Sequence, residues 1–480
     1  MLRLFTILLM MLASTSISSA KLWMPAIFTD RMVLQQNAEV KIWGTADAGL
    51  PVVLTASWAG GERQVVPDKS GTWSLLLQTL PADGKPCHLT ISQGAEQRVI
   101  TDILFGEVWL CTGQSNMEMK MKGYYGKPIL GGPEAIANGA NTQLRFFEVE
   151  KAFSPNEQAD CKGKWLLATP ATVANCSASA YYFGRQLQRT LGVPVALISA
   201  PWGGAAIEAF MSREALSAFP QRLIPKTKEE IKTPNKTPAV LFNGMINPIV
   251  GYALKGCIWY QGETNRSEPA LYKQLYRAML TDWRAKWGVG NFPVYYAQIA
   301  PFTYGDGNSA FMREAQAECE KEMENTGMIT LLDVGEEWDI HPSNKEVVGF
   351  RFAVAALNRT YGVEGIASYG PTFKSMDTVK MKGKVILSFD HAEGGLTTYN
   401  QPLDQFMVAG ADCVFYPAKA DLSGATIIVG CEEVPHPVAV RYGFTDYVKG
   451  TLYNIEGQPA SSFRTDRWDE KGTSVSTLDK

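Results

Sequence analysis

Residues 109–119 read WLCTGQSNMEM, an apolar run that changes abruptly into a polar turn. The apolar part predicts a buried strand, and residues 112–116 predict the turn by which the chain leaves it. An uncharged Ser115 stands between Gln114 and Asn116 in this turn. One interpretation is an ordinary connection from a strand to a helix, and the other is a nucleophile held at the end of a strand. A serine in a turn is more often structural, so the rest of the chain has to decide.

Strand-like and helical stretches alternate around this turn, from residue 106 to residue 365. The strand-like runs are VWLCTG, LRFFEV, PVALIS, GCIWYQG, PVYYAQI and MITLLDV. The clearest helix ends at Gly288, and its apolar residues recur every four positions. These residues are Leu271, Leu275, Met279, Trp283 and Trp287. The alternation predicts an α/β domain with a parallel sheet, whose ligands bind at the carboxyl ends of the strands.

The two ends of the chain have a different pattern. Residues 21–105 and 366–480 contain short alternating strands separated by turns, which is typical of β-sandwich or jelly-roll modules. We therefore predict an N-terminal β domain at 21–105, an α/β domain at 106–365 and a C-terminal β domain at 366–480. The proline-containing stretch 217–240 is expected to be a surface excursion.

The composition and the first residues limit the class of protein. With a formal charge of −3 and 19% charged residues, the chain has no basic surface for nucleic acid. Residues 1–20 combine Arg3, an apolar stretch and a small-residue end, which is typical of a secretory signal peptide. The apolar part is too short to span a bilayer, and no second run of about 20 apolar residues follows. We expect an exported protein, periplasmic or secreted, without stable membrane insertion.

The cysteines and histidines indicate few disulfides and no histidine-rich metal site. Among the eight cysteines, Cys111 and Cys257 lie in apolar runs and are expected to be buried thiols. Cys161 and Cys176 flank a loop-like stretch, and we predict a disulfide between them. The chain has only four histidines and lacks Cys-x-x-Cys pairs, so a histidine-rich metal site is not expected.

Two further motifs place polar groups after predicted strands. PWGGAAIEAF contains the pair Gly203 and Gly204, which forms either a plain tight turn or a close approach of N–H groups, as an oxyanion hole requires. WYQGETN offers Gln261 as a side-chain donor, with Glu263 and Asn265 nearby. A glutamine at a strand end is more often structural.

One histidine lies in the predicted α/β domain. It is His341, in the stretch DVGEEWDIHPSNKEVVGF, and Asp339 precedes it by two residues. The other three histidines fall in the flanking β modules. A serine esterase needs an imidazole base oriented by a carboxylate. If Ser115 is a nucleophile, His341 is therefore the base that the domain offers.

The motifs GEVWLCTGQSNMEM, PWGGAAIEAF, LFNGMINP, IWYQGETN, MREAQ, TGM and DIHP follow one another in the chain. In this order they resemble the sialate O-acetylesterase family, serine esterases of the SGNH hydrolase superfamily. The resemblance extends from LWMPAIFTDRMVLQQ to FRTDRW, which is nearly the whole chain after residue 20. It implies a flavodoxin-like, three-layer α/β/α hydrolase domain between the two β modules. It also implies a reaction that needs no metal or organic cofactor.

The resemblance assigns roles to the motif residues. It implies Ser115 as nucleophile, His341 as base and Asp339 as the acid that orients it. Two positions depart from the family pattern. Ala205 stands where the family often has a threonine, and Ile340 alone separates acid and base where many SGNH enzymes have two residues.

The resemblance also implies an oxyanion hole. Its donors would be the N–H of Ser115, the Gly203–Gly204 turn and one side chain of the QGETN motif. Gln261 is the first choice for that side chain and Asn265 the second.

The expected function is a secreted serine esterase that removes O-acetyl groups from carbohydrate. We expect 9-O-acetylated sialic acid as its substrate, with acetylated xylan or another hemicellulose as the alternative. A sialate site needs a cation for the sugar carboxylate, and the sequence leaves four candidates open: Arg145, Arg213, Arg266 and Arg313. Outside the enzymes, the alternative is a carbohydrate-binding protein with an inert crevice. The joint presence of Ser115, His341 and an oxyanion-hole candidate argues against that alternative.

Overall fold

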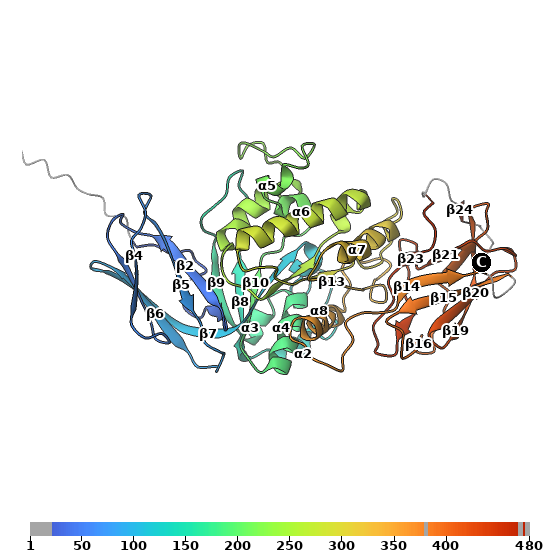
Figure 1. The fold of residues 1–480 in the computed structure, drawn as a ribbon, viewed down its shortest axis with the longest axis horizontal. Helices are drawn as coiled ribbons and strands as arrows, with labels where there is room; N and C mark the ends of the chain where they lie inside the picture. Colours follow the sequence, from blue (N-terminus) through green and yellow to red (C-terminus); the bar gives the residue numbers. More distant parts are fainter. Residues whose placement is uncertain (1–21, 379–382, 469–473, 476–480) are drawn as a thin grey trace, which may run out of the picture.

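The computed structural model describes residues 22–378, 383–468 and 474–475, and it consists of three modules in a row (Figure 1). A β module at each end flanks a central α/β module. The expected signal peptide at residues 1–20 lies outside the described residues. Within the described ranges, no helix combines the length and the hydropathy that a membrane crossing requires.

The central module is built on a sheet whose strands lie in the order β13-β12-β11-β7-β10-β8-β9. Its strands are β7 (Glu96–Gly113), β8 (Asn141–Val149), β9 (Gly163–Ala168), β10 (Val195–Ser199), β11 (Gly256–Tyr260), β12 (Val294–Ala297) and β13 (Thr326–Ile329). All pairings between neighbours are parallel except that of the edge strand β9 with β8. The strand expected from MITLLDV ends early, at Ile329, so the loop that carries His341 is longer than predicted.

Helices cover both faces of this sheet (Figure 1). On one face lie α5 (Arg213–Leu216), α6 (Pro269–Trp287) and α7 (Ala310–Glu322), and on the other lie α2 (Gly132–Ala137), α3 (Pro170–Val173), α4 (Ala178–Leu191) and α8 (Lys345–Arg359). Each face has its own apolar core, because alternate residues of β7 point into different cores. The prediction for α6 is confirmed: Leu275, Met279, Trp283 and Trp287 are buried, and Gly288 ends the helix with φ 68°.

The strand order explains where a ligand can bind. The chain leaves β7 toward α2 on one face of the sheet, whereas it leaves the neighbouring strand β10 toward α5 on the other. Two adjacent strands whose connections part in this way open a crevice at their carboxyl ends. The predicted α/β class is confirmed. The strand order, however, departs from the 2-1-3-4-5 order of a flavodoxin-like sheet. In the central sheet the neighbours of β7 are β10 and β11, whereas β8, the next strand of the chain, lies beyond β10.

The N-terminal module shares a strand with the central sheet. Its strands are β1 (Val33–Gln35), β2 (Glu39–Thr45), β3 (Val52–Ala56), β4 (Glu62–Val65), β5 (Thr72–Gln78) and β6 (Cys87–Gln93). The first half of β7 pairs with β6 and β1, and from Glu107 onward it pairs with β10 and β11. The domain boundary that we predict at 105/106 falls where these partners change.

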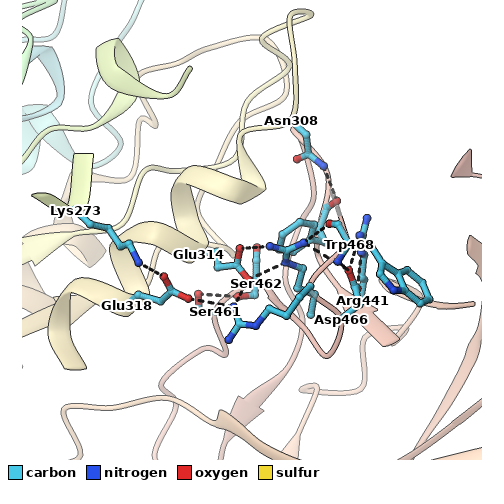
Figure 2. A network of polar contacts seen from close by, with 12 residues as sticks. Lys273, Asn308, Glu314, Glu318, Arg441, Ser461, Ser462, Asp466 and Trp468 are labelled. Atoms are coloured by element: carbon cyan, nitrogen blue, oxygen red, sulfur yellow. Dashed lines mark hydrogen bonds and ion pairs between the residues drawn. The ribbon is translucent and has the colours of Figure 1, made fainter. Parts of the chain in front are cut away.

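The C-terminal module is all β. Its strands are β14 (Thr372–Asp377), β15 (Lys384–Asp390), β16 (Leu396–Thr397), β17 (Phe406–Ala409), β18 (Val414–Pro417), β19 (Lys419–Ser423), β20 (Thr426–Gly430), β21 (Ala439–Tyr442), β22 (Tyr453–Asn454), β23 (Phe463–Arg464) and β24 (Ser474–Val475). Figure 2 shows the polar network that attaches this module to α7. Arg464 holds both carboxylate oxygens of Glu314 at 2.9 Å, and Glu318 bonds Lys273 of α6 at 2.6 Å. The charge pair of Arg464 with Glu314 therefore anchors the module on α7, and the pair of Lys273 with Glu318 ties α7 to α6.

The predicted disulfide is wrong. All eight cysteines are free thiols, and Cys111 and Cys257 are buried as expected. Cys161 belongs to the apolar core on one face of the sheet, whereas Cys176 belongs to the core on the other face. The sheet itself thus separates the two sulfur atoms.

Candidate active site

Ser115 lies beyond the carboxyl end of β7, next to β10, where the strand order predicts a crevice. It is the first residue of the short helix α1 (Ser115–Glu118) and follows the end of β7 by two residues. The turn depends on Gly113, which has φ 133° and whose hypothetical Cβ would lie 2.2 Å from the carbonyl oxygen of Tyr260. Ser115 is half-buried, and its N–H has no partner inside the helix because it stands at the helix start.

The loop that carries His341 packs against the Ser115 turn. Asn116 Nδ2 donates to the carbonyl oxygen of Ile340 at 3.0 Å, which fixes the residue before the histidine. Tyr124 contacts both sides: its ring packs edge-on against His341 with centroids 5.6 Å apart, and its hydroxyl lies 3.5 Å from the carbonyl oxygen of Ser115. The structure therefore places the predicted nucleophile and base on two loops that contact each other.

Asp339 lies behind His341. Its Oδ1 atom is 3.4 Å from His341 Nδ1, and it accepts hydrogen bonds from Lys127 Nζ at 2.6 Å and from the His341 backbone N–H at 2.9 Å. The contact with Nδ1 is too long for a full hydrogen bond, and Nδ1 has no other polar partner in the part of the chain that the structure describes. Catalytic hydrogen bonds are often long before substrate binds and shorten in the complex.

The charges around His341 favour its neutral form. Burial lowers the pKa of the imidazole, and the cations Lys345 and Lys127 lower it further, whereas Asp339 opposes them. Burial raises the pKa of Asp339, but the hydrogen bonds from Lys127 and from the His341 N–H outweigh burial and lower it. At neutral pH the site thus combines an uncharged imidazole with an ionised carboxylate, which is the protonation state that general-base catalysis needs.

The Gly203–Gly204 turn lies across from Ser115. A Cβ on Gly203 would be 3.6 Å from Ser115 Cβ and 3.1 Å from Glu118 Oε2, so a side chain there would fill the space next to the serine. The Gly203 N–H donates to the Glu118 carboxylate, whose other oxygen is 2.6 Å from Lys151 Nζ. This N–H is therefore next to Ser115 but engaged by an anion.

The stretch 217–240 is more than a surface excursion. Its Asn235 donates from Nδ2 to the carbonyl oxygen of Gly203 at 2.8 Å, and the Asn235 carbonyl accepts from the Ala206 N–H at 2.9 Å. These contacts hold Gly204 in its left-handed conformation, with φ 67°. This link could not be predicted from the sequence, because a lone asparagine among prolines is typical of a loop.

The two side chains predicted as oxyanion donors are engaged elsewhere. Gln261 Nε2 donates to the carbonyl oxygen of Ala205 at 3.0 Å and to Asn265 Oδ1 at 2.8 Å. Asn265 donates from Nδ2 to Glu208 Oε2 at 2.9 Å. Both side chains brace the loop that follows the glycine pair. These contacts count against either of them as a free oxyanion donor.

A buried charge network next to Ser115 was not predicted. Lys345 Nζ donates to Asn116 Oδ1, and Asn116 Nδ2 donates to Glu263 Oε1 at 2.7 Å. Lys345 and Glu263 are 0% and 3% exposed. Burial lowers the pKa of Lys345 to about 7, against the opposing effect of Glu263, and burial raises the pKa of Glu263. Asn116 thus ties α1 to α8, to the QGETN loop and to the His341 loop.

Of the four candidate arginines, Arg266 lies in a loop of the site. Its Nη1 donates to the Glu263 carbonyl at 3.3 Å, its guanidinium is 4.3 Å from the centroid of the Tyr304 ring, and it pairs with the exposed Asp306. Arg213 is exposed on α5. The other two are buried in other contacts: Arg145 bonds Asp102, and Arg313 bonds the C-terminal module.

The largest-volume cavity among those found in the described residues lies away from the predicted catalytic residues. A cavity of about 640 Å³ lies between α7 and the C-terminal module, lined among others by Glu318, His391 and Arg464, and its lining includes none of the predicted catalytic residues. Among residues 22–378 and 383–468, no group of three or more His, Cys, Asp or Glu side chains is arranged to hold a metal ion.

Known proteins resemble this chain along most of its length. A family model described as a carbohydrate esterase, sialic acid-specific acetylesterase, matches residues 105–358. The sialate O-acetylesterases of Rattus norvegicus and Homo sapiens are 27% and 28% identical, over 87% and 91% of this chain and 88% and 91% of their own length.

A solved structure extends the comparison to the fold. A carbohydrate acetylesterase from Xanthomonas citri has a TM-score of 0.84 and 33% identity, covering 93% of this chain and 100% of its own. The resemblance predicted from the motifs is thereby confirmed, and the protein is a carboxylic ester hydrolase that acts on acetylated carbohydrate. The chain belongs to the sialic acid-specific acetylesterase family of carbohydrate esterases.

Proposed function

We propose that this protein is an exported serine esterase that removes O-acetyl groups from sialic acid. Ser115 is the nucleophile, His341 the base and Asp339 the acid that orients the base. The observation that carries this proposal is the position of Ser115 at the carboxyl end of β7, with His341 on the adjoining loop and Asp339 behind it. Export is proposed from the leader-like residues 1–20.

The reaction follows from this arrangement. Ser115 Oγ attacks the acetyl carbonyl carbon while His341 Nε2 takes the hydroxyl proton. The tetrahedral intermediate then collapses, the sugar oxygen leaves, and it receives the proton from His341. Water, deprotonated by the same imidazole, attacks the acetyl-serine, releases acetate and restores the free serine.

The oxyanion is stabilised by backbone N–H groups. Ser115 supplies its free N–H at the start of α1, and Gly203 supplies the N–H that Glu118 holds in the absence of substrate. Lys151, whose Nζ is 2.6 Å from the other Glu118 oxygen, remains as the counter-ion of this carboxylate when the oxyanion replaces it at the Gly203 N–H. One oxyanion donor typically contributes roughly 2.7–4 kcal/mol to the stability of the transition state.

Acetate release from three esters, compared side by side, tests the proposal. The substrates are 9-O-acetyl-N-acetylneuraminic acid, acetylated xylan and p-nitrophenyl acetate. We expect the highest kcat/KM on the sialate ester. Higher kcat/KM on xylan would assign the enzyme to hemicellulose, and no hydrolysis of any ester would support the carbohydrate-binding alternative.

Arg266→Ala should weaken the binding of sialate but not of xylan. A guanidinium recognises a carboxylate through paired charge-assisted hydrogen bonds, and such bonds contribute roughly 1.5–3 kcal/mol, or about ten- to a hundredfold in affinity. We therefore expect a KM increase of this size for 9-O-acetyl sialate and no change for acetylated xylan. Arg213→Ala, which removes an exposed arginine from α5, is the matched control. Equal losses on both substrates would instead make Arg266 a support of its loop.

The acidic limb of the pH–rate profile should respond to Lys127. Because the pKa of His341 is lowered, kcat/KM should stay high until the pH falls below about 6.5, the ordinary pKa of histidine. Lys127→Met removes a cation that disfavours the imidazolium, so the limb should move to higher pH. A shift of a few tenths of a unit is expected, since a partly exposed pair contributes roughly 0.2–1 kcal/mol.

The exposed Lys122, five residues earlier, provides the control for this experiment. Lys122→Met changes the net charge equally but should leave the limb in place. The profiles are measured as kcat/KM against pH, which reports the free enzyme. An unchanged limb in Lys127→Met, or a shift to lower pH, would contradict His341 as the base.

A further inference from the structure

Two tight turns next to His341 each present an exposed aromatic side chain. In the first, backbone hydrogen bonds of 2.9 and 3.0 Å join Tyr124 and Lys127, and Tyr125 stands at the tip, fully exposed. In the second, Glu336 and Asp339 form an isolated bridge, and Trp338 stands at the tip with 77% of its surface exposed. A tryptophan is usually largely buried, so this exposure calls for a physical reason.

The two turns are fixed to each other. The last residue of each turn takes part in one ion pair, between Lys127 Nζ and Asp339 Oδ1 at 2.6 Å. The second turn is also held from outside, because the Thr303 N–H donates to the carbonyl oxygen of Glu337 at 3.2 Å. The aromatic residues at the tips are therefore presented by braced backbone.

Both turns are also fixed to the site. Tyr124, the residue before Tyr125, contacts His341 with its ring and the Ser115 carbonyl with its hydroxyl. Trp338 directly precedes Asp339, which lies 3.4 Å from the His341 ring nitrogen. Each exposed ring is thus one residue away from a side chain that touches the base.

We propose that Tyr125 and Trp338 form the surface on which a pyranose ring of the substrate stacks while its acetyl group reaches Ser115. The inference rests on the proposed function, since it takes the leaving group to be a sugar. A pyranose has an apolar C–H face and a polar hydroxyl rim. The aromatic rings of Tyr125 and Trp338 are suited to the C–H face of the sugar. The side chains of Lys127 and Glu336 beside them are partly exposed and suited to its hydroxyl groups.

A protein partner fits this surface less well. Stable protein interfaces bury about 1,200–2,000 Å² in total, and two turn tips flanked by charged residues offer far less. Exposed apolar side chains beside catalytic residues are suited to binding a ligand. A sugar ring bound there would extend the crevice toward solvent, where a glycan chain can continue.

Kinetics on two kinds of ester test the inference. Trp338→Ala and Tyr125→Ala should each raise KM for 9-O-acetyl-N-acetylneuraminic acid by about tenfold with little change in kcat, as expected when an aromatic anchor is truncated. Acetate release from ethyl acetate, which has no ring, should not change. Trp338→Phe should recover most of the affinity. Tyr399→Ala, which removes another exposed aromatic residue (58%) from the C-terminal module, is the matched control.

Binding measured without catalysis separates this inference from the proposed function. In the Ser115→Ala background, calorimetry with 9-O-acetyl-N-acetylneuraminic acid should show an affinity that falls about tenfold when Trp338→Ala is added. Unchanged affinity and unchanged KM would overturn the aromatic surface while leaving the esterase mechanism intact. Equal losses on sialate and ethyl acetate would also overturn it, because the turns would then act on the catalytic residues. If Ser115→Ala retained activity, the mechanism would fail, and the affinity measurement would still decide about the surface.

Discussion

Ser115→Ala should leave a folded protein that releases almost no acetate from any ester. In the proposed mechanism the hydroxyl oxygen of Ser115 is acylated, so without it the two-step route through an acetyl-enzyme is closed. In a well-studied serine hydrolase, loss of the nucleophile lowers kcat by roughly 10⁶. We expect a loss of this order here. The fold should be preserved, because Ser115 is half-buried at the start of a four-residue helix and the change removes one oxygen atom.

Two measurements make this prediction specific. A serine-directed phosphonate should add its mass to the peptide that contains Ser115 in the wild type and to no peptide of the variant. Ser267→Ala, which removes an exposed serine from the loop after β11, should keep full activity. The thermal unfolding midpoint of both variants should stay within a few degrees of the wild type, since surface changes are usually within about ±0.5 kcal/mol. Substantial acetate release by Ser115→Ala would rule out the serine mechanism.

The sequence motifs could be predicted to lie at one edge of the sheet because each of them follows a buried strand. Ser115 follows β7, Gly203 follows β10 and Gln261 follows β11, and these three strands are neighbours in the sheet. Parallel strands end at the same edge, so residues far apart in the chain meet there. Hydrophobic runs identify such strands, and the location of the candidate site could therefore be predicted from the sequence.

The partners of individual side chains could not be predicted. Whether Gln261 has a free donor depends on Ala205 and Asn265, which occupy both of its amide hydrogens. The failed disulfide has a similar cause, since the spacing of Cys161 and Cys176 says nothing about the sheet between them. Lys345 was missed because a lysine in the first turn of a helix is normally solvated, whereas here Asn116 and Glu263 compensate its burial.

The identity of the acid is the remaining question of the triad, and the structure narrows the choice. Asp333 has both carboxylate oxygens on Arg351, at 2.7 and 2.6 Å. Glu336 accepts hydrogen bonds from the backbone N–H and the hydroxyl of Ser343. Glu337 is exposed. Of the four acidic residues on the His341 loop, Asp339 is therefore the one whose carboxylate lies beside the imidazole.

Asp339→Asn should lower kcat by roughly 10⁴, as the corresponding change does in the serine protease triad. In the proposed mechanism the carboxylate accepts a hydrogen bond from Nδ1–H and thereby leaves Nε2 free to take the serine proton, whereas an amide favours the wrong tautomer. Asparagine keeps an oxygen that can accept from the His341 backbone N–H, so the loop should hold its shape. The acidic limb of kcat/KM should also move to lower pH, because Asp339 raises the pKa of His341.

Glu337→Gln is the charge-matched control and should change neither kcat nor the position of the acidic limb. If Asp339 is only a turn residue, kcat should fall by less than about tenfold with the limb in place, since the loss of one local hydrogen bond acts on stability by about 1 kcal/mol. A steep loss in Asp333→Asn together with a mild one in Asp339→Asn would move the acid to Asp333 and would require Arg351 to release it when substrate binds.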